Sequence, residues 1–508
     1  MVSNSLTLRQ VTKNLFSQWF LQFIRLVLSF ITTVFVARVL GPEGYGVATS
    51  IFVFSNLFSF IVDLGFSGSI VRYVSVYSGS GKKCTHIIAG FLVYRVLVGS
   101  LLAITFYVLA PYFASIVNAS KYVAAYQLFS TSIFLSSVYG ALRAYLYGIE
   151  RIDLASLYYS IGFVIGNISS FILVLSGFGV LGYILGFIIS DITQFFIHVL
   201  TLRNLISKCV KVNLNEALSG LKTILPLSLA LLTSKLMDFL YNWFDRALVL
   251  GLLGTYSLGL YSIALRFASV FDIMRQSVST ALTPYYGNLY GANGIEALRP
   301  RVKRSSKLMS LTYIPLTLAI ASLTPILIPL IYGGKFVSSW PIAYIHLTYL
   351  ALTSFTVAYG GIPLVTEARK EIIMSTGIKA LSSIALELLF VIVGLEALGV
   401  ILGRNVGAFL AFMYLYLALF SKLKLDFDKK SHLLGALIGI VISTLLVLPT
   451  FMMKIQFWYL ILPFALTIYP ALLKIFKPID YTDIKLLREA LGTRFNRIVD
   501  IIEDLVAR

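Results

Sequence analysis

Long apolar segments recur along the whole chain, separated by short stretches that carry charge, glycine or proline. Each is about 20–25 residues long, enough for a helix rising 1.5 Å per residue to cross a ~30 Å hydrocarbon core. The pattern predicts an all-α, polytopic membrane protein with about fourteen transmembrane helices. They are expected at roughly 14–37, 45–70, 86–109, 125–147, 154–176, 179–201, 223–251, 256–282, 308–332, 340–365, 372–394, 398–420, 432–450 and 457–473.

Basic residues gather in every second connection between these segments. Arg299, Arg301 and Lys303 follow the eighth segment, for example, whereas Lys121 stands alone after the third. Because positively charged connections stay on the cytoplasmic side, both termini are expected in the cytoplasm and the protein in the plasma membrane. Cys84 and Cys209 would then be cytoplasmic, so neither a disulfide nor a cysteine metal site is expected.

Two stretches of the sequence bear on domain organisation. An offset of 213 residues aligns the stretch 40–46 with 253–259, which predicts two six-helix repeats in the same orientation. The expected domains are an N-lobe at 1–201, a cytoplasmic linker at 202–222, a C-lobe at 223–420, two extra spans within 431–476 and a tail at 477–508. Apolar residues spaced by three and four in the tail predict an amphipathic cytoplasmic helix.

Composition narrows the function classes. The chain is 58% apolar and 12% charged, which excludes a soluble globular protein. The net charge of +19 would suit nucleic acid, but most of the surplus lies in the short connections, so no nucleic-acid partner is expected. The four histidines show no metal-ligand spacing, and no catalytic motif, metal site or cofactor site is predicted.

Charged residues inside the apolar segments are the main candidates for function, since burying a charge in lipid costs at least ~2.5–3.5 kcal/mol. Arg25, Arg95 and Arg266 have no acidic residue within one turn of their own helix. Lys235 with Asp238, and Asp272 with Arg275, are spaced i,i+3 and could instead be intrahelical ion pairs. Charged residues placed nearer a membrane surface are expected to snorkel there; they are Arg143, Asp245, Arg246 and Arg404.

Arginine offers planar, multidentate donors to phosphate oxygens. The sequence therefore predicts an anionic, phosphorylated substrate bound by Arg25, Arg95, Lys235 and Arg266. The carboxylates available for ion coupling or charge pairing are Asp63, Asp191 and Asp238.

The stretch Phe35–Gly46, followed by Asp63-Leu64-Gly65-Phe66, resembles the opening of the polysaccharide-biosynthesis membrane proteins, the O-antigen type oligosaccharide flippases. Asp245-Arg246 and the later Gly259–Ala264 are similar to the span seven to eight region of that family. The resemblance implies the superfamily of multidrug, oligosaccharidyl-lipid and polysaccharide exporters, with MATE-like parallel lobes around a central cavity.

For function, the resemblance implies a flippase that carries a polyprenyl-(pyro)phosphate-linked oligosaccharide from the inner to the outer leaflet by alternating access. Its expected partners are the polyprenyl-linked glycan, membrane lipids and glycan-assembly enzymes. Two alternatives stay open at this point. One is a MATE-like exporter of drugs or other small molecules, and the other is a membrane glycan polymerase or ligase.

Overall fold

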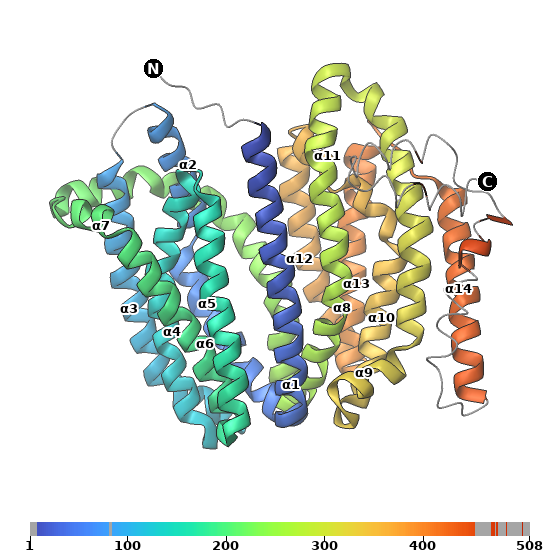
Figure 1. The fold of residues 1–508 in the computed structure, drawn as a ribbon, viewed down its shortest axis with the longest axis horizontal. Coiled ribbons are helices and arrows are strands. Elements are labelled where there is room, and N and C mark those ends of the chain that lie inside the picture. Colours follow the sequence, from blue (N-terminus) through green and yellow to red (C-terminus); the bar gives the residue numbers. More distant parts are fainter. Residues whose placement is uncertain are drawn as a thin grey trace. The chain divides into compact units, whose positions relative to one another are not determined.

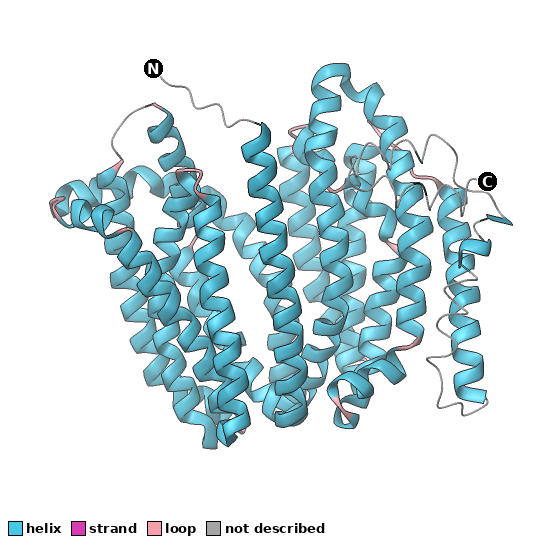
Figure 2. Ribbon diagram, viewed as in Figure 1, coloured by secondary structure: helices cyan, strands magenta, loops and turns pink. Residues whose placement is uncertain are grey.

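The computed structural model describes residues 8–80 and 84–452, and beyond them Tyr469–Leu472, Lys474–Ile475, Ile484 and Asp500. Helices make up this described part, and it contains no strand (Figure 2). The α-helices are α1 (Leu8–Asp63), α2 (Phe66–Gly79), α3 (Thr85–Ile116), α4 (Val123–Gly148), α5 (Ile152–Leu173), α6 (Gly179–Thr201), α7 (Arg203–Val210), α8 (Leu214–Ser322), α9 (Thr324–Tyr332), α10 (Trp340–Leu352), α11 (Ile362–Val365), α12 (Arg369–Ile392), α13 (Glu396–Leu415) and α14 (Lys429–Met452). Single-turn helices are η1 (Ser120–Tyr122), η2 (Val174–Phe178), η3 (Gly334–Ser339), η4 (Ser354–Tyr359) and η5 (Tyr416–Phe420). The predicted all-α class is confirmed.

Seven helices in the described residues are long and apolar enough to cross a membrane, or eight if one bent pair counts as a single span. Three of them exceed a single crossing: Ile24–Gly79 has 56 residues, Ile152–Thr201 has 50 and α8 has 109. Each is interrupted by a glycine in the left-handed region, namely Gly41 at φ 69°, Gly177 at φ 89° and Gly254 at φ 81°. These breaks fall between predicted spans, but the described part does not establish a count of fourteen. Most of the expected span 457–473 and of the tail lies outside the described residues.

Three expected spans have internal breaks, and the one at 308–332 is divided at Leu323 between α8 and α9. The span expected at 45–70 is divided, since α1 ends at Asp63 and Gly65, at φ 83°, precedes α2. The span expected at 340–365 is divided into α10, η4 and α11, with a bend of 53°. At this bend the Thr353 and Thr356 hydroxyls donate to the carbonyls of Tyr349 and Thr353. Such bonds offer the backbone an alternative to regular helix, which hydrophobicity alone does not reveal.

The chain divides into two compact units. Unit 1 comprises Met1–Ser262 with Ile331–Phe336, and unit 2 comprises Ile263–Leu330 with Val337–Arg508. In unit 1, α3 packs on α4 and α5 packs on α6, and the four helices run side by side (Figure 1). In unit 2 the closest helix pairing in the described part is α12 with α13. Each unit thus has its own helical core.

Gly46 of α1 and Gly259 of α8 make a reciprocal close contact inside unit 1. A Cβ atom added to Gly46 would lie 1.7 Å from the carbonyl oxygen of Thr255. One added to Gly259 would lie 1.9 Å from the carbonyl oxygen of Pro42. The offset of 213 residues pairs Pro42 with Thr255 and Gly46 with Gly259, so repeat-equivalent residues exchange contacts as in a two-fold arrangement. Only glycine allows the two backbones to approach this closely.

Candidate anion-binding site

Arg95 of α3 and Asp63 of α1 form a buried ion pair. Arg95 is only 5% exposed, and its Nη2 donates to a carboxylate oxygen of Asp63 and, at 2.6 Å, to the hydroxyl of Ser67. Ser67 in turn donates to the same Asp63 oxygen. The Nε of Arg95 is buried and has no hydrogen-bond partner among the described residues. A buried guanidinium is tolerated here because a carboxylate from another helix compensates its charge.

A polar cavity of about 250 Å³ opens beside this ion pair, entirely within unit 1. Its lining combines two guanidinium groups and one carboxylate with several serines: Ser59, Val62, Asp63, Ser67, Arg95, Ile133, Ser136, Ser137, Gly140 and Arg143. Two positive charges against one negative charge give the cavity a net positive character. Hydroxyl and guanidinium donors together suit an oxyanion.

Arg143 of α4 connects the cavity to a second guanidinium through an aromatic ring. The guanidinium carbon of Arg143 lies 5.5 Å from the centre of the Tyr159 ring, and that of Arg25 lies 5.2 Å from the same ring. Arg25 also donates from Nη1 to the Ser160 hydroxyl at 2.5 Å. Both distances are within the range of a cation–π contact. Tyr159 therefore holds two like charges near each other without a carboxylate between them.

Asp191 of α6 lies in the same unit and faces Tyr139 of α4. The Tyr139 hydroxyl donates to Asp191 at 2.9 Å, and the Tyr139 ring is 5.9 Å from the Arg143 guanidinium carbon. His198 stacks on Tyr139 at 5.8 Å. Tyr139 thus links a carboxylate to the positively charged cavity.

The remaining predicted site residues lie elsewhere. Lys235 and Asp238 of α8 are exposed, and they form no ion pair with each other or with other described residues. Arg266 belongs to unit 2, where it is half-buried. The i,i+3 ion pair considered for Asp272 and Arg275 is also absent from the described residues, because Asp272 accepts from Gln276 and Arg275 donates to Thr356.

Arg143 is the main residue that sequence reasoning set aside. Its count from the end of the segment suggested a snorkelling position, but the structure turns it into the cavity beside Arg95. Tyr139, one turn earlier on the same helix, was the available signal, since residues four apart share a helix face. The partnership of Arg95 with Asp63 left no such trace in the sequence, because it joins two helices.

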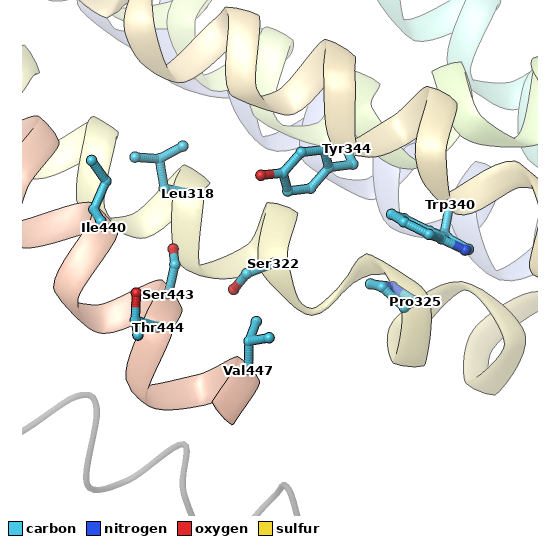
Figure 3. A pocket seen from close by; sticks show the side chains of 9 residues that line it. All are labelled: Leu318, Ser322, Pro325, Trp340, Tyr344, Ile440, Ser443, Thr444 and Val447. Carbon is cyan, nitrogen blue, oxygen red and sulfur yellow. The ribbon is translucent and has the colours of Figure 1, made fainter. Parts of the chain in front are cut away.

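A larger cavity, of about 470 Å³, lies in unit 2 among α8, α9, α10 and α14 (Figure 3). Hydroxyl groups of Ser322, Tyr344 and Ser443 point toward the space between them, and the other lining side chains are mainly apolar. No Arg, Lys, Asp or Glu is among its lining residues. Its chemistry therefore does not select an anion. In the described residues, no group of three or more His, Cys, Asp or Glu side chains could hold a metal ion.

Comparison with known proteins identifies the family of this chain. The model of a family described as "Polysaccharide biosynthesis protein" matches residues 35–341, more than half of the chain. The chain belongs to the polysaccharide biosynthesis protein family. The resemblance inferred from residues 35–46 and 63–66 is thereby confirmed. No curated protein matches the sequence.

Solved structures show how widely the fold of this family member is shared. A lipid II flippase MurJ in an inward closed conformation superposes with a TM-score of 0.69 at 19% identity, covering 91% of this chain and 98% of that one. An inward-facing multidrug resistance MATE transporter of the MOP superfamily gives 0.61 at 18% identity, covering 79% and 95%. A MOP superfamily transporter from Pyrococcus furiosus gives 0.52 at 18% identity, covering 80% and 95%. The fold is that of membrane transporters and flippases.

Proposed function

We propose that the protein is a flippase that moves a polyprenyl-(pyro)phosphate-linked oligosaccharide from the inner to the outer leaflet of the plasma membrane by alternating access. The observation that carries the proposal is the serine-lined cavity of unit 1, where Arg95 and Arg143 outnumber the single carboxylate of Asp63. Family membership supports a role in polysaccharide assembly. A phosphate-bearing head group is the part of such a lipid that this chemistry would recognise.

In this proposal the phosphate head binds the basic residues of unit 1 at and near the cavity, Arg95, Arg143 and Arg25. Roles of Lys235 and Arg266 in substrate binding stay separate predictions. The polyprenyl tail remains in lipid while the head group crosses. With the cytoplasm negative, each negative charge moved outward gains roughly 2.3 kcal/mol per 100 mV. The membrane potential would therefore assist export of a pyrophosphate without any counter-ion.

Single substitution of Arg25, Arg143 and Arg266 by Ala, with turnover of lipid-linked glycan measured in a depleted strain, tests the proposal. We expect each variant to lose at least tenfold in turnover, because each removes a charge-assisted contact worth about 1.5–3 kcal/mol. Arg151→Ala is the matched control, since Arg151 is half exposed and pairs with its neighbour Asp153 at the end of α5. Turnover at the wild-type rate in all three variants would refute the proposed role of these arginines.

A drug exporter is the second candidate, because a multidrug transporter shares the fold. The unit 1 cavity disfavours it, since cationic drugs would be repelled by a net positive lining. Drug sensitivity of a strain lacking the gene separates the two functions. Unchanged sensitivity together with loss of surface glycan supports the flippase, whereas drug sensitivity without glycan loss supports the exporter.

A further inference from the structure

His346 is a histidine in the first arm of the bent span of unit 2. The ring Nδ1 of His346 lies 2.8 Å from the Oδ1 of Asn405 on α13, so Nδ1 carries the proton in this hydrogen bond. The ring also stacks parallel to that of Tyr349, at 6.2 Å and 12°. A titratable side chain within a membrane-length span is expected to have a function, since membrane spans rarely carry one.

The surroundings of His346 are charged. Asp272 and Arg275 of α8 and Arg404 of α13 are the charged groups close enough to act on the ring. Two of the three are cations, so both arginines as well as burial disfavour a proton on the imidazole, and a proton that binds there favours movement of a nearby guanidinium. Within the part of the chain that the structure describes, the Nε of Arg275 and the Nδ2 of Asn405 are buried without an acceptor, a situation typical of sites that hold water. Such water would give protons a route to the ring.

Arg275 ties this cluster to the bend. Its Nη2 donates to the Thr356 hydroxyl in η4 at 3.1 Å, and Thr356 donates to the carbonyl of Thr353 at the break. A change in the position of the Arg275 guanidinium would therefore alter the hydrogen bonds at the break where α10 ends. Repulsion between a protonated His346 and Arg275 would weaken the bond to Thr356.

We propose that His346 is a proton-binding site of unit 2, through which a proton gradient acts on the bend of the α10–η4–α11 span. Protonation adds a cation beside Arg275 and Arg404, displaces Arg275 from Thr356 and changes the angle between the two arms. Deprotonation restores the bond. The link to transport rests on the proposed flippase function, whereas the proton binding and the bending do not.

The bending is measured by spin-label distances in the full chain. Val337 and Leu364 are exposed and lie on opposite sides of the break. Both are changed to Cys, in a background where the two native cysteines are Ser, and the distance is recorded in lipid bilayers between pH 3 and pH 8. We expect a pH-dependent shift that His346→Gln abolishes. His86→Gln is the matched control, because His86 is a partly buried histidine of unit 1 whose ring meets that of Tyr77 edge-on at 6.4 Å.

Asn405→Asp sharpens the test. A carboxylate at Oδ1 favours the protonated ring, so the midpoint of the distance change should move upward by about one pH unit or more. An unchanged midpoint, or a pH-dependent shift that survives in His346→Gln, would overturn the proposal. So would a wild-type distance that does not respond to pH.

Transport is measured in proteoliposomes with an imposed pH gradient and a lipid-linked oligosaccharide. The gradient should change the flipping rate of the wild type several-fold and leave that of His346→Gln unchanged. A gradient response that persists in His346→Gln overturns the coupling role. Absence of flipping by the wild type under every condition would instead count against the proposed function, while the distance measurements still decide the proton site.

Discussion

The two units place charge inside the membrane-length helices in different ways. In unit 1, Arg95 is compensated by Asp63, while Arg25 and Arg143 share the Tyr159 ring beside a cavity. In unit 2, Arg275 and His346 bond to neutral partners, the Thr356 hydroxyl and the Asn405 amide. The first arrangement leaves donors available to a ligand, and the second leaves a titratable ring near a break in a helix.

This difference separates two tasks that a transporter must combine. A binding site needs buried charges that are partly neutralised and donors that remain free to bind a ligand. The ion pair and the cavity of unit 1 combine these two features. A switch needs a group whose charge can change near a point where the backbone can move, as at the bend of unit 2. Substituting the residues of each arrangement one at a time tests this difference between the units.

Arg95→Ala should give the largest effect on stability. It leaves the Asp63 carboxylate without its partner, and breaking a buried ion pair in this way costs about 3–5 kcal/mol. Arg275→Ala removes a bond to a neutral hydroxyl, so about 1.5–3 kcal/mol is expected. Thermal unfolding in detergent compares the two variants. Arg95→Leu combined with Asp63→Leu should recover most of the loss, and equal losses in the two single variants would erase the distinction between the units.

Gly46→Ala and Gly259→Ala should each destabilise the protein by about 1–3 kcal/mol, because a methyl group would collide with a backbone carbonyl of unit 1. The two losses should be similar, since the contact is reciprocal. Gly377→Ala in α12 of unit 2 is the control: a Cβ there has open space, and alanine stabilises a helix by up to about 1 kcal/mol. A Gly46→Ala variant as stable as the wild type would show that the two backbones do not meet this closely.

Tyr159→Leu should weaken transport more moderately. Losing the ring removes a cation–π contact from both Arg25 and Arg143. At about 0.5–1 kcal/mol for each contact of this half-buried ring, the two together predict a roughly 5- to 30-fold fall in apparent affinity for the lipid-linked glycan. Tyr159→Phe keeps the ring and should retain most of the affinity. Tyr112→Leu, at an exposed tyrosine of α3, is the control. If Phe and Leu at position 159 behaved alike, the hydroxyl rather than the ring would position the arginines.

Much of the fold was predictable because membrane-length helices follow directly from continuous hydrophobicity. The all-α class and the breaks near Gly41 and Gly254 could be inferred in this way, whereas the family was inferred from the motifs at 35–46 and 63–66. The bend at Thr353 could not, because the two arms together are apolar enough to be taken for one straight span, and the break involves hydroxyl bonds to the backbone. Hydrophobicity indicates which segments cross the lipid, but it does not indicate where a helix bends or ends within such a segment.

The candidate site was harder to predict than the fold. Arg25 and Arg95 stood out because each is a charge in an apolar segment, but their partners come from other helices. Asp63 reaches Arg95 across 32 residues of sequence, and Tyr159 reaches Arg25 across more than a hundred. Depth counted along a segment also gave no sign that Arg143 lines the cavity, because a long side chain can point toward a cavity as well as toward the surface.

The smallest expected effect concerns the two native thiols, which both lie in unit 1 outside the membrane-length helices. Burial raises the pKa of Cys209 on α7 to about 11, and the neighbouring Cys84 thiol adds to the rise. At pH 8 about one Cys209 in a thousand is then a thiolate, against about one in ten for an ordinary cysteine, so maleimide should react roughly 100-fold more slowly. Reactivity should rise about tenfold per pH unit up to pH 11.

A thiol introduced by Ser421→Cys, at an exposed position of unit 2, gives the reference rate, and Cys84→Ser isolates Cys209. The pH dependence of stability follows from the same rise in the pKa of Cys209. Since the unfolded thiol ionises near pH 8.5–9 and the folded one only near 11, unfolding releases a proton between these values and the folded state loses stability as the pH rises. Labelling of Cys209 as fast as the reference thiol at pH 8 would mean that α7 does not bury it against α3.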